Sequence, residues 1–91
     1  MVKHCVIKIS GQVQGVGVRY QAKQKAEALG LTGYVRNNLA GMVDIEAEGE
    51  SAALERFIAW CRLGPQFAQV ANVEFEYTDK VRNFSSFNIL P

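Results

Sequence analysis

The chain has 91 residues, which fits one domain with a single core, residues 1–91, and excludes two domains. Hydrophobic residues make up 48% of it and charged residues 21%, so the composition is globular and neither disordered nor fibrous. Ten basic and nine acidic residues leave a net charge of +1, which gives no field to attract nucleic acid or anionic lipid. No apolar run approaches the roughly 20 residues of a membrane span, and the start lacks the apolar core of a secretion signal. We therefore expect a cytoplasmic protein that does not bind membranes.

The first third of the chain predicts a strand, a turn and a helix. Residues 3–10 alternate between apolar and other side chains, which is the period of a half-buried strand. A glycine-rich turn follows at residues 11–17. Residues 19–29 then place small and apolar side chains at helical spacing, and Gly30 suits the left-handed position that ends a helix.

The middle of the chain predicts a β-hairpin. Residues 31–37 alternate, and so do residues 42–49, with the turn 38–41 between them. In the second of these strands the apolar side chains point inward. The acidic ones then point outward, where we interpret Glu46 and Glu48 as part of a solvated face.

The last part predicts a second helix and two further strands. Ser51 is a plausible N-cap for a helix at residues 52–63, whose apolar side chains form one stripe that includes Phe57. Residues 68–77 alternate, and a short strand ends the chain around Phe87 and Ile89. The order β-α-β-β-α-β predicts an α+β fold of the ferredoxin-like kind, a sandwich in which two helices cover one face of an antiparallel sheet.

The segment Gly11-Gln-Val-Gln-Gly-Val-Gly-Val-Arg19 carries the clearest chemical signal. Its glycines permit positive φ angles and bring successive amide N–H groups together at the start of a helix, an arrangement that favours an anion such as phosphate. Arg19 adds a planar donor that matches two phosphate oxygens. The spacing fits neither a dinucleotide fingerprint nor a nucleoside-triphosphate loop. Taken alone, the segment is equally compatible with a tight turn and a solvated arginine.

Two motifs together resemble the acylphosphatase family. They are Val13-Gln14-Gly15-Val16-Gly17-Val18-Arg19 after the first strand and Gly33-Tyr34-Val35-Arg36-Asn37 on the next strand. The resemblance implies an enzyme that hydrolyses the carboxyl–phosphate bond of acyl phosphates to a carboxylate and inorganic phosphate. It also implies that Arg19 and the loop amides, carried by Gly15, Val16, Gly17 and Val18, bind the phosphoryl group. Asn37 would orient the attacking water, and the substrate's own phosphate would accept the proton.

The chain departs from the family pattern at two places. Val18 stands where an aromatic residue usually precedes the arginine, and Ala40 stands where the hairpin turn usually has aspartate. Neither departure touches the two positions implied to be catalytic. An asparagine suits the implied role because it has no proton to release near neutral pH, so it can orient a water but cannot act as its general base.

Neither a metal nor another cofactor is expected. His4 is the only histidine and lies on the strand face away from the helices, and no group of Cys, His, Asp and Glu has metal-ligand spacing. Cys5 and Cys61 are interpreted as buried thiols. The sequence does not decide whether they form a disulfide, although a cytosolic compartment favours the reduced thiols.

Two alternatives of other classes remain. RNA-recognition modules use the same element order, but they need aromatic side chains on the open faces of their first and third strands, where this chain has His4, Val6 and Lys8 and then an acidic strip. Acylphosphatase-like accessory domains begin hydrogenase-maturation carbamoyltransferases, which continue into CxxC modules that these 91 residues lack. We therefore predict an independent, monomeric enzyme with a small-molecule substrate, inorganic phosphate or sulfate as ligand, and no nucleic-acid partner.

Overall fold

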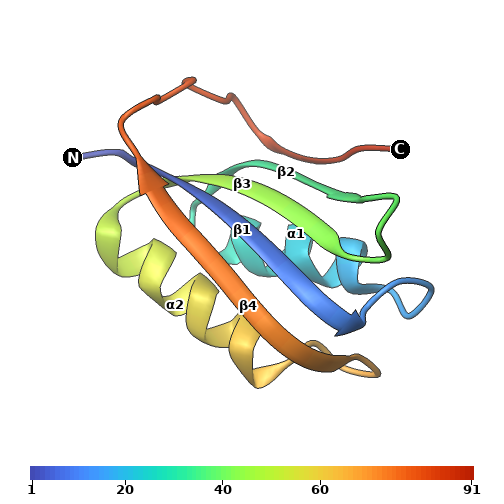
Figure 1. Ribbon diagram of the computed structural model, residues 1–91. Coiled ribbons are helices and arrows are strands. Elements are labelled where there is room, and N and C mark those ends of the chain that lie inside the picture. The colour runs from blue at the N-terminus through green and yellow to red at the C-terminus, as the bar shows by residue number, and fades with distance from the viewer.

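The computed structural model describes all residues, 1–91, and confirms the predicted order of elements (Figure 1). Each predicted boundary lies within two residues of an observed one. The elements are β1 (Lys3–Gln12), α1 (Val18–Ala28), β2 (Thr32–Asn37), β3 (Val43–Gly49), α2 (Ser51–Leu63), β4 (Gln69–Thr78) and β5 (Phe87–Ile89).

The five strands form one sheet in the order β4-β1-β3-β2-β5. β1 pairs antiparallel with β3 and β4, and β2 pairs antiparallel with β3, as expected. β5 instead pairs parallel with β2, so the sheet is mixed and not wholly antiparallel. The reason lies in the direction of the chain: β4 runs antiparallel to β2 and ends where β2 begins. The segment after β4 crosses to the opposite edge and turns back, so β5 runs antiparallel to β4 and parallel to β2.

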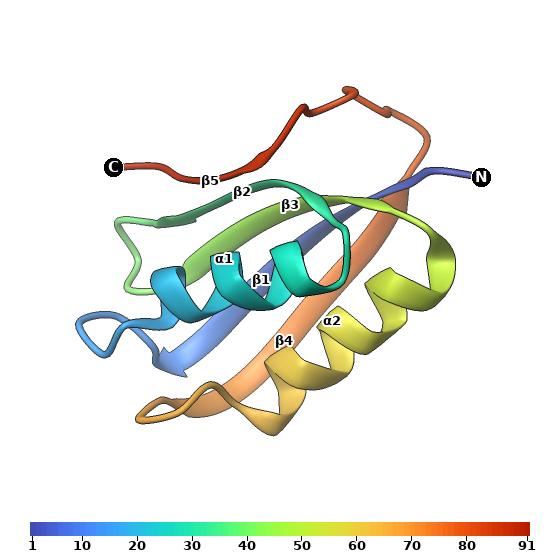
Figure 2. The same ribbon diagram turned by 180° about the vertical axis from the view of Figure 1, so that it is seen from behind.

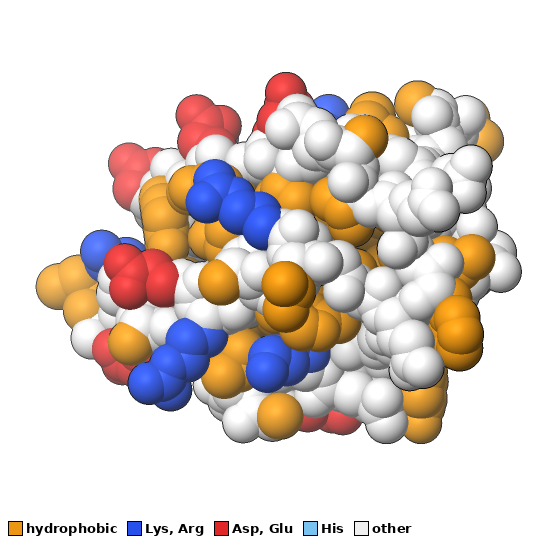
Figure 3. Space-filling view, turned by 90° about the horizontal axis from the view of Figure 1, so that it is seen from below, with side chains coloured by type: hydrophobic (Ala, Val, Ile, Leu, Met, Phe, Trp, Pro, Cys, Tyr) orange, Lys and Arg blue, Asp and Glu red, His pale blue; other side chains and the backbone are white.

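Both helices cover the same face of the sheet, as the view from behind shows (Figure 2). The core lies between these two layers and includes Phe57 and Phe87, whose rings contact each other edge to face. Neither helix has the length and hydrophobicity that crossing a membrane would require. Seen from below, basic, acidic and hydrophobic side chains are interspersed on the surface, without a continuous basic area (Figure 3).

Two element ends differ from the sequence prediction for identifiable reasons. β1 continues to Gln12 because a register shift at Ser10 and Gly11 lets it keep pairing with the start of β4. α2 begins at Ser51, not after it, because the Leu54 amide already donates to the Glu50 carbonyl at 3.0 Å. Glu50 is therefore the N-cap, and no side chain caps this helix.

The face of the sheet away from the helices is partly covered by the crossover segment, residues 79–86, which joins β4 to β5. In Figure 1 it passes above one end of the sheet. The backbone amides of Arg82 and Phe84 both donate to the carboxylate of Glu48 on β3, at 2.5 and 3.3 Å. The prediction that Glu46 and Glu48 form a solvated face is therefore wrong, because both carboxylates are buried beneath this segment.

Candidate active site

The candidate active site lies where β1 and β2 end. Both strands run antiparallel to β3 between them, so they are parallel to each other and their carboxyl ends meet at the same edge of the sheet. The loop at residues 13–17 leaves β1 there and leads into the first turn of α1. The fold thus brings the two sequence motifs together, although Arg19 and Asn37 are 18 positions apart in the chain.

A pocket of about 220 Å³ occupies this edge. Five of the predicted site residues line it: Gly15, Gly17, Val18, Arg19 and Asn37. Val16, the remaining predicted one, does not line it and packs against the core instead. Three lining residues were not predicted: Val13, Tyr20 and Ile89. Tyr20 follows Arg19 directly, whereas nothing local in the sequence connects Ile89 to the loop.

The loop has the backbone conformation that its glycines predict. Gly15 and Gly17 have φ angles of 77° and 81°, which lie in the left-handed region. Gly17 is also the N-cap of α1, and no side chain caps the helix there. The first amide N–H groups of α1 therefore have no side-chain acceptor. Such a helix start, with its partial positive charge, favours an anion.

Arg19 is half-buried, and its side chain contacts the backbone of the residue that follows β5. Its Nη1 donates to the backbone carbonyl of Leu90 at 3.4 Å. Leu90 is itself fixed, because its amide donates to the Val35 carbonyl at 2.9 Å beside the β2–β5 pairing. No carboxylate pairs with Arg19 in the structure, so its charge is not neutralised within the protein.

Asn37 ends β2 and has an unusual hydrogen-bonding state. Its Oδ1 is buried and has no hydrogen-bond partner, and it is the only buried side-chain N or O atom in the protein of which this is true. The neighbouring Asn38 differs: its Oδ1 accepts from the amides of Ala40 and Met42, at 2.8 and 3.0 Å. Asn38 thus stabilises the hairpin turn, whereas the fold makes no use of the Asn37 oxygen.

Gln14 connects the loop to the hairpin, a role that the sequence did not reveal. Its Nε2 donates to the carbonyls of Asn38 and Met42, both at 2.9 Å. These two carbonyls lie on either side of the turn that follows β2. The Gln14 side chain therefore fixes the distance between the loop that carries Arg19 and the strand end that carries Asn37.

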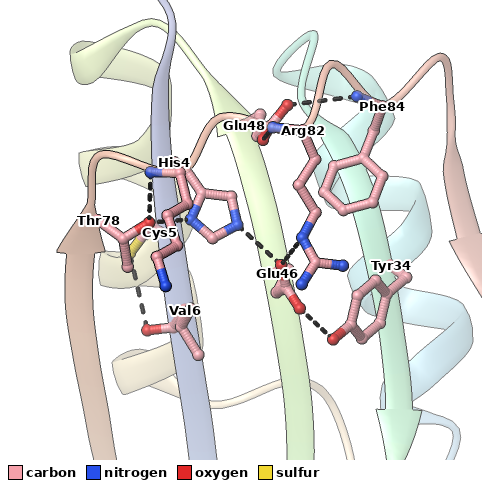
Figure 4. Close-up of polar contacts among 10 residues, drawn as sticks. His4, Cys5, Val6, Tyr34, Glu46, Glu48, Thr78, Arg82 and Phe84 are labelled. Carbon is pink, nitrogen blue, oxygen red and sulfur yellow. Dashed lines mark hydrogen bonds and ion pairs between the residues drawn. The ribbon is translucent and has the colours of Figure 1, made fainter.

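A second polar group lies at the other end of β1, beneath the crossover segment (Figure 4). We call it the His4 cluster: His4, Tyr34, Glu46, Thr78 and Arg82. His4 Nε2 donates to Glu46 Oε1 at 2.8 Å, and its Nδ1 lies 2.5 Å from the Thr78 hydroxyl. The Tyr34 hydroxyl donates to Glu46 Oε2, and Arg82 Nε lies 3.4 Å from Oε1. Each carboxylate oxygen of Glu46 therefore has a donor.

These contacts determine the charge state of Glu46. Burial alone raises the pKa of its carboxyl group, but the hydrogen bonds from Tyr34 and His4 and the charge of Arg82 outweigh burial, so the pKa lies below its ordinary value. Burial together with the Glu46 carboxylate raises the pKa of Tyr34. The cluster therefore holds an ionised, fully partnered carboxylate, and none of its residues lines the pocket.

Both cysteines are free and buried, as predicted. Burial raises the pKa of Cys5 to about 11, and burial together with nearby Cys5 raises that of Cys61 to about 12. A thiol reacts as its thiolate, so neither is suited to act as a nucleophile near neutral pH. No group of three or more His, Cys, Asp and Glu residues is placed to hold a metal ion.

The family profile described as acylphosphatase matches residues 5–89. The chain belongs to the acylphosphatase family. It is 41% identical over 83 residues to an acylphosphatase from Pelotomaculum thermopropionicum, an alignment that covers 91% of this chain and 90% of that relative. Its fold is similar to an acylphosphatase structure from Coxiella burnetii, with a TM-score of 0.93 and 36% identity, covering 98% and 93% of the two chains. The family predicted from the two motifs is confirmed, and with it the predicted enzyme class, a hydrolase of acyl phosphates.

The chain is also similar to part of a much longer protein. Full-length HypF, solved in a phosphate- and nucleotide-bound form, matches all of this chain with a TM-score of 0.92 and 30% identity, but the match covers only 12% of that protein. A segment with this fold therefore also occurs within a longer protein.

Proposed function

We propose that this acylphosphatase-family enzyme binds the phosphoryl group of its substrate in the pocket formed by the loop after β1, Arg19 and Asn37. One observation carries the proposal: the only buried side-chain polar atom without a partner, Asn37 Oδ1, belongs to a residue that lines the same pocket as Arg19 and the uncapped start of α1. A fold that satisfies its other buried polar side chains has left this one free for a ligand or a water.

The phosphoryl group would be bound by groups that are positive but not neutralised. The amides of residues 15–19 and the start of α1 supply partial charges, and Arg19 supplies a full charge with two parallel donors. These donors are held before substrate arrives, because Leu90 fixes the arginine and Gln14 fixes the loop. Donors fixed in advance are the ones that stabilise charge in a transition state.

Asn37 would orient the attacking water. An acyl phosphate already has a good leaving group, so the protein mainly has to hold the phosphoryl group and direct a water at it. The Asn37 amide can accept from and donate to such a water, but it cannot take its proton. The proton would go to an oxygen of the substrate's own phosphoryl group. The carboxylate and inorganic phosphate are then the products.

A titration with inorganic phosphate tests this assignment directly. In ¹⁵N-labelled protein we expect the amide signals of residues 15–19 and the Asn37 side chain to shift, and phosphate to inhibit hydrolysis of benzoyl phosphate competitively. The Gly15→Ala variant separates backbone from side chain: an added Cβ meets no atom within 4 Å, but the φ of 77° becomes strained. Phosphate affinity should fall in this variant. Shifts confined to the open face of the sheet would place the anion site elsewhere.

The reaction should need no metal and no thiol. The proposed donors are amides, a guanidinium and an asparagine, and both cysteine thiols are buried. We expect exhaustive EDTA treatment to leave the turnover of benzoyl phosphate unchanged, as measured by the absorbance of the substrate. Loss of activity on chelation followed by recovery with Zn²⁺ or Mg²⁺ would contradict the mechanism.

We also propose that residues 1–91 act as one monomeric, cytoplasmic domain without a nucleic-acid partner. Reduced, buried cysteines suit a reducing compartment. The open face of β1 carries no Phe, Tyr or Trp, and the Tyr34 ring on β2 packs edge to face against Phe84 of the crossover segment. The surface in Figure 3 has no continuous basic area. Sedimentation at several protein concentrations tests whether the protein is monomeric. The same measurement with added single-stranded RNA tests whether it binds nucleic acid.

A further inference from the structure

The pocket has two chemically different parts. Its polar part consists of the loop glycines, Arg19 and Asn37, which the proposed function assigns to the phosphoryl group and the water. Its apolar lining comes from two pairs of residues. Val13 and Val18 are only 1% and 2% exposed and belong to the core. Tyr20 and Ile89 are 61% and 39% exposed, so they line the pocket where it opens to solvent.

Tyr20 and Ile89 come from distant parts of the chain. Tyr20 lies in the first turn of α1, and Ile89 is the last residue of β5, and these two elements pack against each other. Exposed large apolar side chains are ordinary when they are scattered, but two that line the same pocket form a surface that a ligand can cover.

Both side chains are held in place by their surroundings. The Tyr20 hydroxyl accepts a hydrogen bond from Gln24 Nε2 at 3.1 Å, one helical turn away, which restricts the ring. The backbone of Ile89 is fixed because β5 pairs it with Val35 on β2. The residue after it, Leu90, holds Arg19 through its carbonyl. Side chains that are already restricted, such as these two, lose little conformational entropy when a ligand covers them.

An acyl phosphate has the same two parts as this pocket, a charged phosphoryl group and an acyl group. We propose that Tyr20 and Ile89 form an acyl subsite that favours apolar, and especially planar aromatic, acyl groups over small ones. This inference rests on the proposed function, because it places the phosphoryl group at the polar end. The acyl carbon chain or ring would then leave the pocket through its mouth and lie against the Tyr20 ring and the Ile89 side chain.

The subsite should act mainly through binding. Contacts to a part of the substrate that does not react are made in the ground state and the transition state alike, so they lower KM more than they raise kcat. For the unmodified protein we expect kcat/KM for benzoyl phosphate to exceed that for acetyl phosphate by roughly tenfold, the order that a small apolar contact provides in an open site.

The decisive measurement is the ratio of kcat/KM for benzoyl phosphate to that for acetyl phosphate. In Tyr20→Ala we expect this ratio to fall about fivefold through a higher KM for benzoyl phosphate. Tyr20→Phe keeps the ring and should keep most of the ratio. Ile89→Ala should lower it by a smaller factor. The matched control is Tyr77→Ala, which removes another exposed tyrosine from β4 at the opposite edge of the sheet and should leave the ratio unchanged.

The outcomes separate this inference from the proposed function. An unaltered ratio in folded Tyr20→Ala and Ile89→Ala, or equal use of both substrates by the unmodified protein, overturns the acyl subsite and leaves the phosphate assignment standing. Phosphate titration that leaves residues 15–19 silent overturns the phosphate assignment instead, and the acyl subsite with it. A fall in the ratio with an unaltered inhibition constant for inorganic phosphate supports the subsite, because phosphate has no acyl group to contact the wall.

Discussion

The two ends of β1 carry polar groups that the fold treats in opposite ways. At its start, every hydrogen-bonding atom of the Glu46 carboxylate has a donor, and the crossover segment closes over the cluster. At its end, Asn37 keeps a buried oxygen without a partner, and Arg19 keeps a charge without a carboxylate. A buried polar group that is fully partnered contributes to stability, whereas one left without a partner costs stability and calls for an explanation such as a bound water or ligand. The contrast supports the proposal that the pocket at the end of β1 binds the substrate, while the His4 cluster stabilises the fold.

The largest expected effect comes from Arg19→Lys. A lysine keeps the charge but cannot reproduce two parallel donors in a fixed plane, so kcat/KM for benzoyl phosphate should fall by roughly 10²-fold or more. The free energy of unfolding in urea should change little, because the Arg19 side chain makes only one hydrogen bond within the protein, the long one to the Leu90 carbonyl. Arg56→Lys, on the exposed face of α2, is the matched control. A folded Arg19→Lys protein with near-normal kcat/KM would show that another group holds the phosphate.

Asn37→Ala should lower kcat by somewhat less, roughly tenfold to 10²-fold, since a water is no longer oriented but the phosphoryl group is still bound. The inhibition constant for inorganic phosphate should stay close to that of the unmodified protein. Removing a buried atom that has no partner should also cost almost no stability, within about 0.5 kcal/mol. Asn38→Ala provides the contrast, because it removes three side-chain hydrogen bonds, two with amides of the turn and one with Asp44. A raised KM with an intact kcat would instead make Asn37 a binding residue.

Glu46→Gln should lower stability and leave activity nearly unchanged, the opposite of what is expected for Arg19→Lys and Asn37→Ala. It removes the negative charge that His4, Tyr34 and Arg82 face and replaces one of the two acceptor oxygens by an NH2 donor. The free energy of unfolding at pH 7 should therefore fall by about 2 kcal/mol, while kcat/KM stays within about twofold. The matched control is Glu76→Gln on the exposed side of β4. A large loss of activity without loss of stability would mean that the His4 cluster serves the pocket.

The same variant predicts a pH dependence with a definite sign. The pKa of Glu46 is lower in the folded than in the unfolded state, so the unfolded state binds more protons between the two values. The stability that ionised Glu46 provides is therefore complete above the ordinary glutamate pKa of about 4.3 and is lost as pH falls through the folded pKa. The difference in unfolding free energy between Glu46→Gln and the unmodified protein should shrink over that acidic range.

The smallest effect concerns phosphate as a ligand of the folded state. At about ten times its dissociation constant, phosphate should stabilise the protein by about 1.4 kcal/mol, which raises Tm by several degrees in a domain of this size. The gain should persist in Glu46→Gln and largely disappear in Arg19→Lys. Equal stabilisation by phosphate in both variants, at matched ionic strength, would indicate a general salt effect. It would contradict phosphate binding at the end of β1.

The fold was predictable because its local signals agree with its global plan. Alternation in the strands and the apolar stripe of α2 depend only on neighbouring residues, and they predicted the element order. The burial of Glu46 and Glu48 was not predictable in this way. Alternation correctly turned both away from the helices, but their cover comes from a segment more than 30 positions later in the chain.

The residues of the candidate site also fall into those that local sequence motifs predict and those that only the fold brings together. Its predicted residues lie in two contiguous motifs, and the structure brings most of them to one pocket. Gln14 stood within the first motif without a visible task, because its two acceptors are carbonyls of a distant turn. Ile89 lines the pocket, and Leu90 contacts Arg19, only because β5 adds to the sheet in the parallel direction, which no short-range pattern indicates.

The position of β1 between β3 and β4 also has a kinetic consequence. Its partners all come later in the chain, and its pairing with β4 joins His4 to Thr78. Pairings between residues so far apart form slowly, which places the folding of such sheets toward the millisecond-to-second range. We expect the loop that leaves β1 to reach its final shape only after this strand is paired on both sides. Bound phosphate should therefore slow unfolding far more than it speeds folding, because its contacts are made after the rate-limiting step.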